Sequence, residues 1–215
     1  MVPFPVIDTS TSSNLTGHLF ILGFGGHARS AADVAVSAGW SNITFVDRNV
    51  IDGEHFSAYH AIRELPEVQR PDWQVFPAAG DNSRRRAQIE ATTAKLATLV
   101  SSSARFGLEA IVGEATFVGH GAHVGPGAIV GRGVILNTQS IVEHEVRIGD
   151  YAHVSVNAVV AGRARIGRNV FVGAGAVVID SISVCDDVVI GAGAVVSSSI
   201  DEAGVYVGVP ARRMK

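Results

Sequence analysis

A histidine between two glutamates is the arrangement of side chains in this sequence that is best suited to proton transfer. His144 lies between Glu143 and Glu145, so carboxylates are available to orient the imidazole and to raise its basicity. Such a histidine can act as a general base. A base is needed when an amine attacks a thioester, because the amine must lose a proton as its bond to the carbonyl carbon forms. The thiolate leaves readily, so no covalent enzyme intermediate is required.

The element that carries His144 is a six-residue repeat. Every sixth residue from Val112 to Val196 is aliphatic, and the residue four positions later is most often small or β-branched. Glycine often follows the aliphatic residue directly, as at Gly113 and Gly149, and we expect it to mark a sharp turn or a positive φ. Six residues make one strand and one corner, and three such sides close a coil. The repeat therefore predicts a parallel β-helix of about five coils.

The repeat departs from its own rule around His144. Between Asn137 and Asn157, the segments LNTQS, VEHEV and VSVNA replace the form V-G-x-G-A. Because irregular positions in an otherwise consistent pattern are typical of functional sites, we expect the chemistry to lie in this stretch.

The outward-facing residues of the repeat fall into three columns, one of which is almost wholly apolar. A strand that faced solvent would not be apolar, so we expect this side to be buried against another subunit. The column contains His123, Ile141, Val159, Val177 and Val195.

The segment before the repeat alternates apolar runs with helix-like stretches, which is the rhythm of βαβ units. Strands are expected in HLFILG, NITFVD and QVFPAA, and helices at residues 28–37, 60–68 and 83–96. The apolar runs are nearly continuous, as in a parallel sheet that is buried on both faces. We therefore expect a small Rossmann-like α/β domain over residues 18–103 and the β-helix over residues 104–215.

A glycine-rich loop follows the first expected strand. Gly25, Gly26 and His27 open the first helix, where backbone N–H groups can approach a phosphate. Asp47 with Arg48, and Gly80, come at the ends of later strands, and ligands of open α/β sheets bind at that edge. The alternative is a tight structural turn, since G-x-G-G-H is a weak fingerprint. Arg84, Arg85 and Arg86 are expected to form a solvated helix face, or to offer one arginine to a phosphate.

Composition limits the function classes. A net charge of −3, with 47% hydrophobic residues, gives no footprint for nucleic acid or anionic membrane, so we expect a small-molecule ligand. Cys185 is the only cysteine, which excludes an internal disulfide and suits the reducing cytoplasm. No apolar run is long enough to span a membrane, and the N-terminal segment lacks the charged and apolar regions of a signal peptide.

The segment SIVEHEVRIGDYAHVSVNAVVAG resembles hexapeptide-repeat N-acetyltransferases that act on nucleotide-linked 4-amino-4,6-dideoxyhexoses, including the perosamine and bacillosamine-pathway enzymes. The ending GVYVGVPARRM is also similar to that family. The resemblance implies a left-handed β-helix, a homotrimer and acetyl-CoA as co-substrate, with no metal required. In this family the base and its partner correspond to His144 and Glu145.

The same resemblance implies further site residues. Asn137 would lie near the sugar amine and His153 would contact acetyl-CoA, while the backbone at Ala174 and Ala192 would hold the pantetheine. Arg147 and Arg165 in another outward column form either a solvated face or a site for the phosphates of coenzyme A. The resemblance also implies that four loop residues bind the nucleotide sugar: Gly25, Gly26, His27 and Gly80.

Several readings remain open from the sequence. Overall resemblance favours GDP-perosamine as the acceptor, whereas UDP- or dTDP-linked aminosugars are alternatives. A zinc lyase of the γ-carbonic-anhydrase type is a second enzyme class for this β-helix, with His120, His123, His144 and His153 as the histidines that invite the comparison. A non-catalytic spacer is a third. The zinc lyase is disfavoured because the H-x4-H pair of zinc ligands expected in that class is absent from the repeat. The non-catalytic spacer is disfavoured by the Glu-His-Glu corner.

Overall fold

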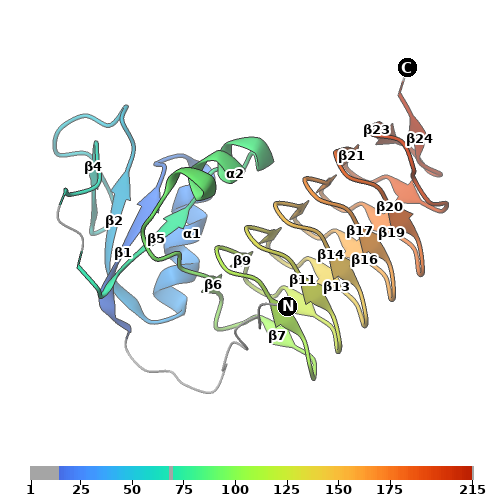
Figure 1. Cartoon of the computed structure of the whole chain (residues 1–215), viewed down its shortest axis with the longest axis horizontal. Helices are drawn as coiled ribbons and strands as arrows, with labels where there is room; N and C mark the ends of the chain where they lie inside the picture. The colour runs from blue at the N-terminus through green and yellow to red at the C-terminus, as the bar shows by residue number, and fades with distance from the viewer. Residues whose placement is uncertain (1–14, 68–69, 215) are drawn as a thin grey trace.

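The computed structural model of the protein describes residues 15–67 and 70–214. Residues 1–14 lie outside the described residues. The prediction that the N-terminal segment is not a signal peptide falls mostly on these residues. The described chain forms an α/β unit followed by a long solenoid of short strands (Figure 1). None of the helices in these ranges is both long and apolar enough to cross a membrane.

The α/β unit contains a five-stranded sheet with two helices, α1 (Gly26–Ser37) and α2 (Asn82–Ala91). The alanine-rich face of α1 shares one apolar cluster with the sheet and with three solenoid residues, Leu99, Phe117 and Ile135. Helix α1 is therefore packed between the sheet and the solenoid. The strands lie in the order β3 (His55–Phe56), β4 (Tyr59–Ile62), β2 (Trp40–Val46), β1 (Leu15–Leu22), β5 (Trp73–Pro77), and all neighbours except β3 and β4 are parallel.

Two expected helices differ from the structure. The expected helix at residues 60–68 is wrong where it is described, because β3 and β4 form a hairpin around Ser57 and β4 extends the sheet beside β2. The expected helix at residues 83–96 ends at Ala91 instead. Its last residues are drawn into an extended segment, in which the backbone of Val75 bonds to that of Lys95 and Ala97, because the edge of β5 offers unpaired backbone groups.

The solenoid has three flat sides, each built mainly from parallel strands 18 residues apart, and the last strand of the third side is antiparallel to its neighbour. Face 1 contains β7 (Arg105–Phe106), β10 (His123–Val124), β13 (Ile141–Val142), β16 (Val159–Val160), β19 (Val177–Val178) and β22 (Val195–Val196). Face 2 contains β8 (Ile111–Val112), β11 (Ile129–Val130), β14 (Arg147–Ile148), β17 (Arg165–Ile166) and β20 (Ser183–Val184). Face 3 contains β6 (Leu99–Val100), β9 (Phe117–Val118), β12 (Ile135–Leu136), β15 (His153–Val154), β18 (Phe171–Val172), β21 (Val188–Ile190), β23 (Gly204–Val207) and β24 (Arg212–Arg213).

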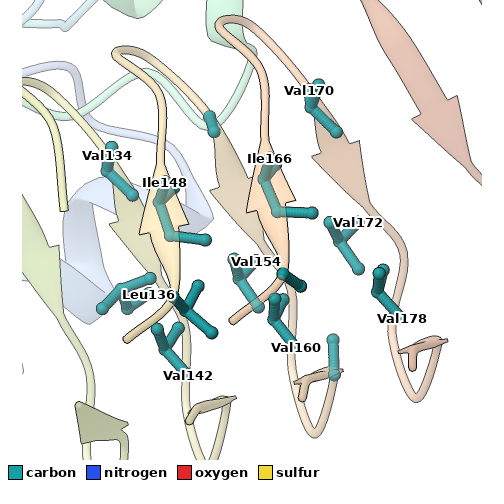
Figure 2. Close-up of a cluster of buried hydrophobic side chains, with 14 of the residues drawn as sticks. Val134, Leu136, Val142, Ile148, Val154, Val160, Ile166, Val170, Val172 and Val178 are labelled. Carbon is teal, nitrogen blue, oxygen red and sulfur yellow. The ribbon is translucent and has the colours of Figure 1, made fainter. Parts of the chain in front are cut away.

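The expected β-helix is confirmed, but it is somewhat longer than five coils. Strands β6 and β7 stack beneath β9 and β10, so the coiling begins two sides before Val112, and β6 precedes the expected boundary between residues 103 and 104. Figure 2 shows the repeating aliphatic side chains turned into the interior, where Leu136, Val154 and Val172 are fully buried. Burial of each such side chain contributes roughly 1.5–3 kcal/mol to the free energy of folding. The stacked aliphatic side chains therefore supply a large part of the stability of the solenoid.

The corner glycines have a different cause from the one that the sequence suggested. The positive φ recurs three residues after each aliphatic residue, and side chains such as Ala115, Gln139 and Glu145 occupy it as well as glycines. Gly149, which follows its aliphatic residue directly, has no positive φ. A Cβ there would lie 2.6 Å from the carbonyl carbon of Gly167 in the next coil. Close stacking of the coils, and not backbone conformation, requires these glycines.

Replacement of a stacked glycine should therefore destabilise the fold more than replacement of an open one. We expect Gly149→Ala to cost about 2 kcal/mol, as overpacking does, which lowers the Tm by roughly 4–8 °C. Gly175 has a φ of 65° with open space at its Cβ position, so Gly175→Ala should cost about 1 kcal/mol. Thermal unfolding of both variants checks this, and equal losses would contradict the stacking explanation.

Candidate functional site

His144 lies at the corner between face 1 and face 2, directly after β13. Its side chain is 44% exposed, and Nδ1 lies 3.9 Å from Oε2 of Glu145, which is within ion-pair range but too long for a hydrogen bond. Glu143 is occupied differently, because its carboxylate accepts from the backbone N–H of His144. Of the two flanking glutamates, only Glu145 is placed to act on the imidazole.

The imidazole of His144 lies over Gly162, the residue 18 positions later in the next coil. A Cβ at Gly162 would meet the ring at Cε1 and Nε2, and at Cδ2 at 3.1 Å. The absence of a side chain at this one position therefore leaves room for the ring. Sequence reasoning did not identify Gly162, although the 18-residue stacking pointed to it as the neighbour of His144.

A second group of predicted residues meets where the α/β unit covers face 3. His153 points outward from β15 and is only 7% exposed. Its Nδ1 lies 3.3 Å from the carbonyl oxygen of Gly80, and its Nε2 lies 3.3 Å from Nδ2 of Asn137. The ring of His27 lies 6.4 Å from that of His153. The structure thus brings His27 at the start of α1, and Gly80 after β5, onto two residues of the irregular stretch.

Both histidines in this group are held in the neutral form. Burial, reinforced by the charge of Arg85, lowers the pKa of His27 from 6.5 to about 4. Burial also lowers the pKa of His153 to about 3, with smaller contributions from Arg85 and His27, although the bond to Gly80 acts in the opposite direction. Nε2 of His27 is buried without a hydrogen-bond partner in the described part of the chain, which makes it an unsatisfied polar atom at the junction.

Arg85 corrects the expectation of a solvated arginine face on α2. Arg84 and Arg86 are exposed as expected, but Arg85 is fully buried at the junction of the two units. The reason is the direction of α2, which turns this side chain toward the solenoid, where the carbonyl of Gly133 accepts from its Nε at 2.7 Å.

The remaining loop residues lie along the carboxyl edge of the sheet. Asp47 and Arg48 line a cavity of about 660 Å³ beside the ends of β1 and β2, and one carboxylate oxygen of Asp47 accepts from the backbone and side chain of Asn49. Gly25 precedes α1 without a side-chain cap, and Gly26 is exposed. The first N–H groups of α1 are therefore available to an anion.

The structure does not bring all the predicted residues together within one chain. Ala174 and Ala192 are exposed at the corner between face 3 and face 1, on the same edge as Asn137. His144 lies on the opposite edge of face 1, and no hydrogen bond joins it to Asn137 or His153 in the described ranges. The predicted catalytic residues thus form two half-sites on the two edges of one face.

The histidines that suggested a zinc lyase are used in other ways. No cluster of three or more His, Cys, Asp or Glu side chains within residues 15–67 and 70–214 is arranged to hold a metal ion. His120 instead bonds to Asp33 of α1 at 3.0 Å and to Ser101 at 2.6 Å, which links the two units.

The two units match two different families of known domains. Residues 18–92 match the PglD N-terminal domain. Residues 163–198 match the hexapeptide repeat of succinyl-transferase.

The chain is similar to solved structures of acetyltransferases. The acetyltransferase domain of PglB from Neisseria gonorrhoeae is 27% identical, with a TM-score of 0.84 over 93% of this chain and 100% of that one. The same domain in complex with acetyl coenzyme A is 29% identical, with a TM-score of 0.83 over 92% and 98%. A histidine-to-alanine variant of GDP-perosamine N-acetyltransferase from Caulobacter crescentus, in complex with CoA and GDP-perosamine, is 25% identical, with a TM-score of 0.84 over 93% and 98%. The chain is therefore a hexapeptide-repeat acyltransferase with a PglD-type N-terminal domain, as its resemblance in sequence predicted.

Proposed function

We propose that the protein transfers the acetyl group of acetyl-CoA to the C4 amino group of a nucleotide-linked 4-amino-4,6-dideoxyhexose. One observation carries the proposal: the nucleotide-sugar loops of the α/β unit, at His27 and Gly80, lie against His153 and Asn137 of the irregular stretch. A sugar held by the loops would thus be delivered to the acyltransferase solenoid. The PglB domain and perosamine N-acetyltransferase, which bind acetyl-CoA or CoA with GDP-perosamine, support this assignment.

His144 is proposed as the general base. The sugar amine attacks the carbonyl carbon of the thioester, the C–S bond breaks, and the thiolate of CoA leaves with the electron pair. The amine proton passes to the imidazole of His144, and Glu145 at 3.9 Å stabilises the imidazolium that results. Asn137, proposed near the sugar amine, holds the acceptor for this attack. His153 and the backbone of Ala174 and Ala192 are proposed as contacts of acetyl-CoA.

The α/β unit is proposed to bind the nucleotide. The uncapped start of α1 at Gly25 and Gly26 suits the diphosphate, and Asp47 with Arg48 in the neighbouring cavity suits the nucleoside. Overall resemblance favours GDP-perosamine over UDP- and dTDP-linked aminosugars. A binding panel of the three nucleotide classes separates these alternatives.

A homotrimer is proposed because the site needs two chains. Face 1 is an apolar surface of half-buried aliphatic residues, and Val156 and Ile179 at its two edges are each 38% exposed. If three copies pack around an axis with this face inward, the edge that carries His144 in one copy meets the edge that carries Asn137 in the next. Trimerisation would bury the apolar face and join the two half-sites.

Removal of the imidazole should abolish the chemistry without abolishing binding. We expect His144→Ala to lower kcat by about 10²- to 10⁴-fold, while calorimetric binding of the nucleotide sugar persists. Glu145→Gln should lower kcat by less than about ten-fold, because this carboxylate is exposed and makes no hydrogen bond to the ring. An unchanged rate in His144→Ala would rule out His144 as the base.

Gly162→Ala tests the position of the imidazole and not its identity. The added methyl group overlaps the place of the ring, so the base must move by an ångström or more. We expect kcat to fall by about 10²-fold with little change in the KM of either substrate. Gly149→Ala, which overpacks the coils at a different corner, is the matched control, and an equal effect in both variants would contradict the role of Gly162.

Mixed subunits test whether the site is shared between chains. Val159→Glu on face 1 should reduce the mass measured by light scattering to that of a single 22.4 kDa chain and remove activity, because the buried charge opposes association. Co-expressed His144→Ala and Asn137→Ala chains should regain part of the activity that each lacks alone, since some interfaces then combine both intact residues. Absence of any recovery would place the whole site within one chain.

A further inference from the structure

Arg85 is a buried cation that holds the junction of the two units. It is fully buried, and no carboxylate lies within ion-pair distance of it in the described part of the chain. Its guanidinium is solvated by oxygen atoms from both units. These are the carbonyls of Gly133, Ala79, Gly80, Tyr151 and Ala152, and the side-chain oxygen of Asn82, at distances of 2.7–3.3 Å.

Three of these oxygen atoms determine where His153 lies. Tyr151 and Ala152, whose carbonyls accept from Nη2 at 2.8 and 3.2 Å, directly precede His153 in the chain. The carbonyl of Gly80 accepts from Nη1 at 3.3 Å and is also the partner of Nδ1 of His153. Arg85 therefore fixes both the backbone that leads into His153 and the atom to which its ring bonds.

The contacts of His153 determine its tautomer. A carbonyl oxygen can only accept, so Nδ1 must carry the proton and Nε2 must present its lone pair. Nε2 then accepts from Nδ2 of Asn137 at 3.3 Å. The other side of the Asn137 amide is also defined, because its Oδ1 accepts from the N–H of Thr138 at 2.8 Å. One N–H of Asn137 remains to donate outside this network.

The charges around His153 act in the same direction. Arg85 on α2 and His27 on α1 face it across the junction. Arg85, and His27 when it is itself protonated, disfavour a second proton on the ring, beyond the larger effect of burial on its pKa. Asp81, the cap of α2, interacts with Arg85 but is exposed, so solvent screens it. A protonated His153 would also lose the lone pair that receives Asn137.

We propose that Arg85 is a positioning residue: by gripping the Gly80 carbonyl and the backbone before His153, it fixes the Nδ1–H tautomer of His153 and thereby aims the amide of Asn137 into the acceptor site. The link from Arg85 to His153 and Asn137 stands on the contacts alone. Its effect on catalysis rests on the proposed acetyl transfer.

The direct test is NMR of the histidine rings in the full-length protein labelled with ¹³C and ¹⁵N histidine. His153, assigned by the loss of its signals in His153→Gln, should show the Nδ1–H tautomer from about pH 8 to pH 5. In Arg85→Gln we expect a mixture of tautomers and a ring that titrates within this range. Arg86→Gln, which changes the next residue of α2 at an exposed site, should leave the ring unchanged. An Nε2–H tautomer in the wild-type protein overturns the proposal, even if Arg85→Gln does not fold.

Kinetics test the consequence for catalysis. Arg85→Lys keeps the charge but cannot span these carbonyls, so we expect kcat to fall by at least about ten-fold with KM for the nucleotide sugar changed by less. A wild-type rate in Arg85→Lys or Arg85→Gln would overturn the positioning role. If the wild-type protein itself fails to acetylate aminosugars, the proposed function fails, whereas the ring spectra still decide whether Arg85 fixes His153.

Discussion

The structure depends on the stacking of each coil directly on the one 18 residues before it. Neighbouring coils share one row of backbone hydrogen bonds on each face, so their separation cannot vary, and every side chain must fit the space that this spacing leaves. The same constraint places a glycine at Gly149 and the imidazole of His144 over Gly162. The close stacking that stabilises the solenoid therefore also determines which residue of the next coil lies against the proposed base.

The first coils of the solenoid also depend on the α/β unit, which covers their outward apolar residues. On face 3, Phe117, Ile135 and His153 point outward, yet all three are buried, because α1, α2 and the end of β5 pack on them. An apolar outward column can thus be covered by the same chain or by another copy. Only the first coils of face 3 are covered by their own chain, since Val189 further along this face is 39% exposed, and the half-buried aliphatic residues of face 1 are proposed to be covered by another copy.

The sequence predicted the periodic parts of this architecture because a six-residue repeat has only one way to bury fifteen aliphatic residues in a row. The departure from the repeat also directed attention to His144, whereas the roles predicted for Asn137 and His153 came from the resemblance to a known family. The sequence could not predict Arg85, which belongs to no pattern in the chain. Its neighbours Arg84 and Arg86 are exposed, and only the packing of α2 on the solenoid distinguishes the three. The hairpin in place of a helix at residues 60–68 has the same cause, because the open edge of β2 selected an extended strand.

Arg85 has no carboxylate partner among the described residues, and this has a physical consequence for the junction. A buried guanidinium must be solvated, and either an acidic side chain or a set of carbonyl dipoles can do this. A carboxylate would cancel most of the charge and hence its field at His27 and His153. Carbonyls satisfy the hydrogen bonds but leave the net charge, which adds to the larger effect of burial in lowering the pKa of both histidines. Solvation by backbone oxygens therefore gives one residue two roles: it joins the two units, and it adds to the effect of burial that keeps the imidazoles between them neutral, so that Nε2 of His153 stays an acceptor for Asn137.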